Sequence, residues 1–418
     1  MIERCIELST KQLDFLNRSN RIGLLLAGLG FGKTFIGALW LIKKALEHPN
    51  TSSVMSSKDY GQLTQALDKE ILTVLSIMGM EEGKHYQRLK SPKLTYTFRN
   101  KSTITGLSAL NYDSAFRAIN VNFLLMDELA FYEPEAFQTA LGRVRKSPSQ
   151  IRCTTTPQGF NFVHEYFVSR PPSDCFVITA TTYDNELLPE EYIQSLKDSY
   201  PDKLFQQECM AEFIDLTAEA AYFSFTREFN VADVSMREGI QIYCALDFNV
   251  SPMCSVIFQI VDNKIMVFDE IVIPDNADTY KFSSLLMSKY GKKINIIADS
   301  TGGNRSTVGP SNHAILANSG FTLLPSKNPF VFDRVMAVNK MLQDRRVLIN
   351  PKCEHLIRCL NKTTWSRSGK LDQSKDKTLT HSSDSLGYAI CKLFPPAYGT
   401  YKSIDRSSSI LIDSGNNY

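Results

Sequence analysis

The sequence predicts an α/β protein of two domains, and three observations support this prediction. The chain has 418 residues, more than one compact core usually organises. Both halves contain short apolar runs typical of buried strands, and these runs alternate with helical patterns. Several of the runs end in carboxylate residues, and one in the first half ends in a glycine-rich loop.

Composition limits the class of protein. Hydrophobic residues make up 43% and charged residues 22%, which is ordinary globular usage, and the net charge is only +2. No apolar run approaches the roughly 18 residues that cross a bilayer, and the N-terminus has no apolar signal region. Nine cysteines without a C-x-x-C pair indicate reduced thiols. We expect a cytoplasmic protein that does not span a membrane.

The first element of interest is a strand that leads into a glycine loop. Residues 22–27, IGLLLA, predict a buried strand, and a helical pattern begins at Phe35. Between them lies a sequence close to G-x-x-x-x-G-K-[ST], except that Ala27 replaces the first Gly; the alternative is a plain glycine-rich turn. In such a loop, backbone amides and a lysine bind phosphate and a hydroxyl holds Mg²⁺. The residues expected to do so are Gly28, Gly30, Gly32, Lys33 and Thr34.

A second strand carries two acids. Residues 123–126 are apolar and deliver Asp127 and Glu128 to the end of the strand. Asp127 is expected to hold Mg²⁺ and Glu128 to orient the attacking water as general base. The alternative is an acidic helix cap before residues 133–144.

A third strand, 151–153, runs into the threonines 154–156 and Pro157. Hydroxyls at this strand end, those of Thr155 and Thr156, can sense the γ-phosphate. Threonine-rich strand ends are common, so the order of the three motifs matters more than this one.

The second half begins after an irregular segment, 214–238, which we interpret as a linker. Strands are expected at 242–247, 254–261 and 265–268, then a helix near 278–290 and a strand at 294–299. This order matches a ribonuclease H-like domain with a sheet of mixed direction, spanning 239–396. The Ser-rich residues 397–418 are expected to form a flexible tail.

Four acids of this half stand at the ends of elements: Asp247, Glu270, Asp299 and Asp384. Converging carboxylates repel one another unless cations neutralise them, and two Mg²⁺ ions serve this purpose in phosphodiester cleavage. Strand alternation lets only one of Asp269 and Glu270 face the site. The alternative is that these are unrelated surface acids.

Positive charge is concentrated in residues 340–377, which hold ten Lys or Arg against four Asp or Glu. With Trp365, Arg367 and Lys370 around a turn at Gly369, the segment suits contact with a phosphate backbone. A solvated charged face is the alternative.

The order of these motifs resembles the large terminase subunit of tailed bacteriophages. The resemblance covers residues 8–394 and includes LSTKQLDFL, AGLGFGKT, FLLMDE and TTTP followed by QGFNFVHEYF. It implies a P-loop NTPase domain of the additional-strand, catalytic-glutamate type at 1–213, followed by the nuclease domain. The implied cofactors are ATP and Mg²⁺, with Mn²⁺ also suited to the nuclease site. The implied partners are double-stranded DNA, the portal or prohead, a small terminase subunit and further copies in a ring, in the host cytoplasm.

The resemblance also implies roles for single residues. Gln12 would contact adenine, although an ordinary surface Gln is nearly as well supported. Glu270 is favoured over Asp269, and His381 precedes Asp384 as in the family's last nuclease motif, although a surface position suits His381 better. Leu29 stands where family loops often carry an Arg, so another Arg must stabilise the γ-phosphoryl charge. Arg117 is the first candidate and Arg143 the second.

Two other functions remain open on the sequence alone. One is another ATPase and nuclease fusion, such as a repair helicase. The other is a non-catalytic DNA-binding or capsid adaptor that keeps the two folds.

Overall fold

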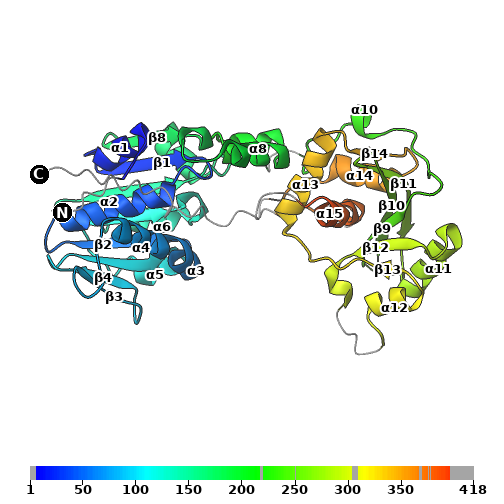
Figure 1. Cartoon of the computed structure of the whole chain (residues 1–418), viewed down its shortest axis with the longest axis horizontal. Coiled ribbons are helices and arrows are strands. Elements are labelled where there is room, and N and C mark those ends of the chain that lie inside the picture. The colour runs from blue at the N-terminus through cyan, green and yellow to red at the C-terminus, as the bar shows by residue number, and fades with distance from the viewer. Residues whose placement is uncertain are drawn as a thin grey trace, which may run out of the picture. The chain divides into compact units, whose positions relative to one another are not determined.

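The structure is a computed structural model that describes residues 6–216, 220–249, 251–303, 309–366, 370–374, 376 and 378–395. The described chain forms two compact units (Figure 1). One contains the residues up to 194 together with 203–215, and the other contains 195–202 and the residues from 216 onward. Within these described ranges, no helix is both long and apolar enough to cross a membrane.

The first unit is built on an eight-stranded sheet with the strand order β3-β4-β5-β2-β6-β7-β1-β8. The strands are β1 (Ile22–Ala27), β2 (Ser52–Ser57), β3 (Tyr86–Leu89), β4 (Thr95–Phe98), β5 (Thr103–Ser108), β6 (Phe123–Asp127), β7 (Gln150–Thr155) and β8 (Cys175–Ala180). From β5 to β8 the neighbouring strands are parallel, whereas β3, β4 and β5 pair antiparallel. β7 lies between β1 and β6, so the additional strand separates the glycine-loop strand from the acidic strand.

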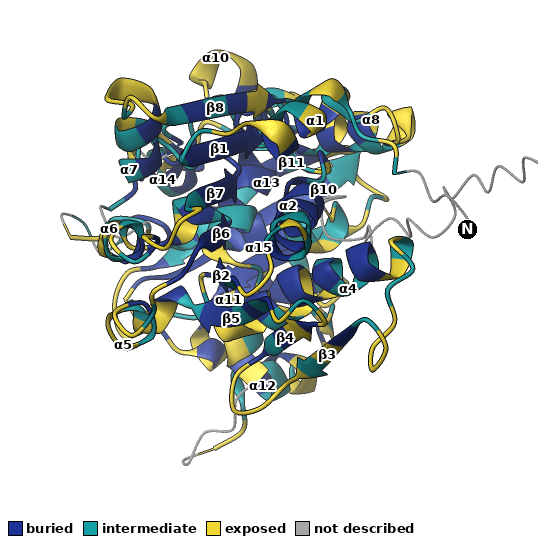
Figure 2. Ribbon diagram, turned by 90° about the vertical axis from the view of Figure 1, so that its left-hand side faces the viewer, coloured by how far each residue is buried: buried dark blue, intermediate teal, exposed yellow. Residues whose placement is uncertain are grey.

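The helices of this part of the chain are α1 (Thr10–Asn17), α2 (Lys33–Glu47), α3 (Tyr60–Gln62), α4 (Asp68–Ile77), α5 (Tyr112–Ala115), α6 (Pro134–Leu141), α7 (Phe162–His164), α8 (Glu190–Ser199) and α9 (Asp202–Glu208). Every residue of β1 is buried, as are those of β6 (Figure 2). Strands buried on both faces are typical of parallel sheets covered by helices, which is why they are continuous apolar runs in the sequence. All three parallel strands that end in the predicted motifs therefore reach the same edge of the sheet.

The second unit contains a six-stranded sheet with the order β13-β12-β9-β10-β11-β14. The strands are β9 (Ile242–Asp247), β10 (Met253–Val261), β11 (Lys264–Ile273), β12 (Ile294–Ala298), β13 (Thr322–Leu323) and β14 (Val347–Ile349). β9, β10 and β11 pair antiparallel, while β12 pairs parallel with β9. The predicted α/β class and the mixed direction of this sheet are confirmed.

Helices lie on both faces of this second sheet. They are α10 (Arg227–Asn230), α11 (Thr279–Tyr290), α12 (Asn312–Asn318), α13 (Val331–Gln343), α14 (Glu354–Lys362) and α15 (His381–Leu393). α11 and α12 pack on one face through Phe282, Leu286 and Leu316, whereas α15 packs on β9 and β10 from the other side (Figure 1).

The irregular segment 214–238 is in part packed into the second unit. Buried Asn230 donates hydrogen bonds to the carbonyl oxygens of Leu342 (3.1 Å) and Val347 (3.3 Å). Its role as a linker stays a prediction, as do the predicted domain boundaries. Residues 217–219 and the predicted tail at 397–418 lie outside the described residues.

Candidate active sites

The glycine loop connects β1 to α2 and is held closely by the chain around it. A Cβ on Gly28 would lie 2.4 Å from the carbonyl oxygen of Cys209, so only glycine fits there. Gly32 precedes α2 with φ +90°, a conformation that favours glycine. Because no side chain caps α2, its first amide groups remain available for an anion.

Lys33 and Thr34 begin α2 and point toward the ends of the neighbouring strands. The Lys33 ammonium group is buried, donates to the Thr156 hydroxyl at 2.8 Å and lies 3.5 Å from the Glu128 carboxylate. The Thr34 hydroxyl donates to both Asp127 oxygens at 3.1 and 3.2 Å. The structure thus brings together residues that are up to 123 positions apart.

Asp127 is a buried acid with an altered pKa. Burial raises the pKa of Asp127 to about 7, and the charge of Glu128 adds to the increase. A hydrogen bond from Thr154 and the charge of Lys33 act in the opposite direction. A cation beside Asp127 would favour the ionised carboxylate, so the site suits a divalent ion.

Glu128 directly follows β6 in a left-handed backbone conformation, φ +55°, which non-glycine residues seldom adopt. Its carboxylate accepts a hydrogen bond from the Thr156 amide at 3.4 Å. Thr155 is fully buried, and its hydroxyl accepts from the Ala130 amide, so it supports the backbone after Glu128 instead of facing the loop. The sequence analysis missed Thr154, the member of the triplet that binds Asp127.

Gln12 is buried, so the alternative of an ordinary surface Gln is wrong. Its amide nitrogen donates to the Phe31 carbonyl at 3.0 Å, and its amide oxygen accepts from the Ser9 amide at 3.0 Å. Gln12 therefore links α1 to the glycine loop and completes a capping box.

Glu208 is a site residue that the sequence analysis missed. Its carboxylate accepts from Gln158 at 3.2 Å and Gln207 at 3.1 Å. Burial raises its pKa, partly offset by the Gln207 hydrogen bond and the charge of Lys33. Its own carbonyl oxygen accepts from the Leu29 amide at 2.8 Å, which fixes the loop.

The two arginine candidates lie elsewhere in the first unit. Arg117 pairs with Asp113 at 2.9 Å, and both side chains are 66% exposed. Arg143 follows α6 and is half-buried. Among the described residues, neither forms a hydrogen bond or ion pair with the glycine loop of its own chain, which is compatible with a role toward a second copy.

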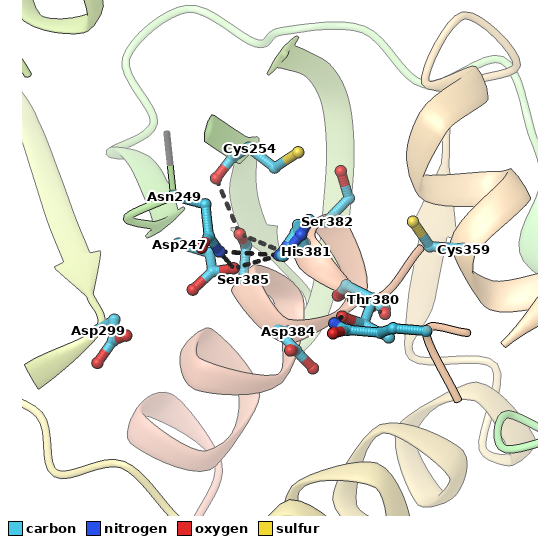
Figure 3. A network of polar contacts seen from close by, with 12 residues as sticks. Asp247, Asn249, Cys254, Asp299, Cys359, Thr380, His381, Ser382, Asp384 and Ser385 are labelled. Atoms are coloured by element: carbon cyan, nitrogen blue, oxygen red, sulfur yellow. Dashed lines mark hydrogen bonds and ion pairs between the residues drawn. The ribbon is translucent and has the colours of Figure 1, made fainter. Parts of the chain in front are cut away.

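In the second unit, three of the four predicted acids lie around one end of the sheet. Asp247 ends β9, Asp299 follows the parallel neighbour β12, and Asp384 lies in the first turn of α15 (Figure 3). The Asp299 amide donates to the Leu246 carbonyl at 3.1 Å, which places the two strand ends side by side.

Each of these carboxylates is held by donor groups. Asp247 accepts from Asn249 at 2.8 Å and pairs with His381 at 3.0 Å. His381 is only 12% exposed, so its expected surface position is wrong: the helix start packs against β9. Asp384 pairs with Arg334 of α13 at 2.7 Å.

Asp299 accepts from the amide of Thr301 at 2.8 Å, from its hydroxyl at 2.9 Å, and from the Asn328 side chain. Arg334 and Asn328 were not predicted, because each lies 29 or more positions from its acid and no local motif marks it.

The acidic group suits a divalent cation. Burial raises the pKa of Asp384 to about 6, Arg334 opposes the increase, and the charge of Asp247 adds to it. Carboxylate oxygens are the ligands that Mg²⁺ prefers. In the described ranges, no three acidic, His or Cys side chains are yet close enough to hold one ion together.

Glu270 lies apart from this group, which counts against the prediction that it binds the same metal ions. Its two oxygens accept from the amides of His355 (2.8 Å) and Leu356 (2.9 Å) at the start of α14. Asp247 of β9 lies opposite Cys254 of β10, and Cys254 lies opposite Val272 of β11, not opposite Glu270. Asp269 faces away and pairs with Lys289 at 3.0 Å, as strand alternation predicted.

The basic segment 340–377 is only partly described. Trp365 is buried and packs against Phe332 at 6.0 Å between ring centroids, so it is not available to a phosphate backbone. Arg367 and Gly369 lie outside the described residues.

Comparison with known proteins places this geometry in context. Residues 24–228 match a family model described as the terminase large subunit, T4likevirus-type, N-terminal. No curated protein matches the chain.

Solved structures match over nearly the whole chain. The large terminase of a thermophilic bacteriophage has a TM-score of 0.64 and 17% identity, covering 92% of this chain and 99% of that one. The same terminase in complex with ADP has a TM-score of 0.63 and 18% identity, covering 93% and 100%. At such low identity the likeness shows the fold.

Proposed function

We propose that this chain, whose residues 24–228 match the model of the N-terminal region of T4likevirus-type large terminase subunits, is an ATP-driven DNA translocase joined to a metal-dependent endonuclease. One observation carries the proposal. The loop residues Lys33 and Thr34 meet the acids Asp127 and Glu128 at the carboxyl ends of neighbouring parallel strands, which is where a nucleoside triphosphate and its Mg²⁺ would bind.

The substrate of the first site would be Mg²⁺-ATP. The amides of Gly28 and Leu29 already donate to the carbonyl oxygens of Ala180 (2.9 Å) and Glu208 (2.8 Å). The amides of Gly30 and Gly32 would therefore bind phosphate oxygens, as would Lys33 once it leaves Thr156. Thr34 and Asp127 already share a hydrogen bond, and both would face the Mg²⁺ that arrives with the nucleotide.

Glu128 would act as the general base of this site. Its carboxylate lies 3.5 Å from the Lys33 ammonium group, so Lys33 must turn to the γ-phosphate before Glu128 can orient a water. Thr156 contacts both residues and would report whether the γ-phosphate is present. Thr155 supports the backbone that follows Glu128.

Gln12 and the arginines complete the proposal for this unit. Gln12 has one amide hydrogen and one oxygen lone pair left beside its two internal hydrogen bonds, enough to contact adenine at the loop. Arg117, or Arg143 as second choice, would stabilise the charge on the γ-phosphoryl oxygens of a neighbouring copy.

The second site would cut DNA with Asp247, Asp299 and Asp384 as ligands of Mg²⁺, and Mn²⁺ also suits these oxygen ligands. When bound, such ions activate a water and stabilise the leaving oxygen. Asn249 and His381 would hold Asp247 in place, and the charge of Arg334 favours the ionised form of Asp384.

The family implies DNA and the packaging machinery as partners. More specifically, we propose double-stranded DNA as the substrate, a portal or prohead as the docking site, a small terminase subunit as cofactor protein, and a ring of several copies in the host cytoplasm. The rivals are a repair helicase joined to a nuclease and a non-catalytic capsid adaptor.

Packaging of DNA into purified empty proheads tests this proposal. We expect ATP-dependent protection of DNA from added nuclease, and ATP hydrolysis that rises when proheads are added. Hydrolysis that responds to DNA but not to proheads would favour the helicase. The absence of both ATP hydrolysis and Mn²⁺-dependent cutting would favour the non-catalytic adaptor.

A further inference from the structure

An aromatic ring stands in solvent at the start of α13. Phe330 is 83% exposed, more than any other large hydrophobic side chain that the structure describes. It is the residue before α13, and its neighbour Phe332 instead turns inward onto Trp365. The exposed ring presents a flat apolar face that a partner can cover.

Two anchors fix the backbone on either side of Phe330. Two residues before it, Asn328 hydrogen-bonds Asp299 and accepts from the Ser300 amide at 3.0 Å. One helical turn after it, Arg334 pairs with Asp384, and its amide donates to the Phe330 carbonyl at 3.0 Å.

These anchors place the start of α13 close to the acidic group. Two residues of chain span at most about 7 Å, and one helical turn rises about 5.4 Å. The Phe330 backbone is therefore only two residues from Asn328, which binds Asp299, and one helical turn from Arg334, which binds Asp384. The backbone that carries the ring is held near these acids, with little backbone freedom left to lose on binding.

Charge points to the chemistry of the occupant. Lys327 is exposed three residues before Phe330 and can contact a phosphate oxygen. Lys327 and Phe330 thus put a cation and an exposed aromatic ring in one short segment, near the acidic group proposed to cut a phosphodiester. This combination suits a DNA strand, whose backbone is anionic and whose bases offer flat apolar faces.

We propose that Phe330 is a wedge that inserts between DNA bases next to the phosphodiester that the acidic group cuts. Phenylalanine and other apolar side chains that insert at a base step unstack it partially and bend the duplex. Such a bend would expose the target phosphodiester to Asp247, Asp299 and Asp384. This proposal rests on the nuclease function proposed above.

Fluorescence of 2-aminopurine tests the wedge without relying on cutting. A set of short duplexes, each with 2-aminopurine at one position, is mixed with the full chain and Ca²⁺, which keeps the strands intact. We expect fluorescence to rise at one or two positions with the unmodified chain and with Phe330→Trp, because the base step opens. With Phe330→Ala the rise should be lost, and Mn²⁺-dependent cutting should fall about tenfold.

The matched control is Tyr280→Ala. Tyr280 is 60% exposed on α11, which covers the opposite face of the sheet, so its loss should change neither signal. Equal fluorescence and cutting for Phe330→Ala and the unmodified chain would overturn the wedge. A fluorescence rise in a chain that cuts no DNA would support the wedge and contradict the nuclease proposal.

Discussion

Each of the two candidate sites contains a buried acid beside a second carboxylate and a cation. Burial raises the pKa of Asp127 to about 7 and that of Asp384 to about 6. Each acid has a second carboxylate and one cation as neighbours: Glu128 and Lys33 for the first, Asp247 and Arg334 for the second. A divalent ion would offset the repulsion within each acid pair, which is why both sites are expected to need Mg²⁺ for full activity.

Glu128→Gln separates ATP binding from hydrolysis. The loop and Lys33 remain, so ATP should still bind, whereas loss of the general base should slow hydrolysis about 10² to 10⁴-fold. Binding is measured with a fluorescent ATP analogue and hydrolysis by phosphate release. Glu133→Gln, at an exposed acid before α6, is the control. Hydrolysis at the unmodified rate would remove Glu128 from its role.

Among the elements, the glycine loop depends on close contact with the chain near Cys209. Gly28→Ala would force a Cβ into the Cys209 carbonyl, so the loop must shift. We expect ATP binding to weaken at least tenfold and the melting temperature to fall by several degrees, roughly as for a loss of 1 kcal/mol or more.

Gly142→Ala is the matched control for this substitution. Gly142 has φ −74°, and its Cβ would meet no atom closer than 3.6 Å. If the Gly28→Ala chain bound ATP with the same affinity as the Gly142→Ala chain, the close contact at the loop would not be needed for ATP binding.

Glu270 is expected to stabilise α14 and not to bind metal. Glu270→Ala leaves two amides at the helix start unpaired, which costs about 0.5–2 kcal/mol. The chain has two Trp residues, one in each unit, so urea unfolding of the second unit can be followed through Trp365 in a Trp40→Phe background. DNA cutting by the folded variant should persist; a stable Glu270→Ala chain that cuts no DNA would restore its role as a ligand.

The strands and their terminal acids were predictable, whereas their partners were not. Apolar runs such as 22–27 and 123–126 mark buried strands, and residues directly after them must lie at the sheet edge. Arg334 of α13 and Asn328, which precedes that helix, reach the acids only through the tertiary fold, which no local pattern encodes. Alternation fixes the face of a strand but not the level along it, so the distance of Glu270 from Asp247 could not be predicted.

At the scale of the whole molecule, substitution of Arg117 tests whether neighbouring copies cooperate in ATP hydrolysis. Because Arg117 is 66% exposed and forms no hydrogen bond with its own loop among the described residues, Arg117→Ala should bind ATP but hydrolyse it about 10³-fold more slowly or worse in the assembled ring. Mixing it with Lys33→Ala, which keeps its Arg117, should restore part of the activity. If activity does not recover at any mixing ratio although mixed assembly is confirmed, Arg117 does not act on the ATP of a neighbouring copy.

ATP hydrolysis and DNA cutting are expected at two chemically separate sites of one chain, and paired assays on two variants test this most directly. ATP hydrolysis and Mn²⁺-dependent DNA cutting are measured on the same preparations of Lys33→Ala and Asp299→Asn. Lys33→Ala should lose hydrolysis and keep cutting, and Asp299→Asn should lose cutting and keep hydrolysis, because each residue serves only its own unit. Loss of both activities in either variant, in a properly folded chain, would contradict two sites and indicate one shared centre.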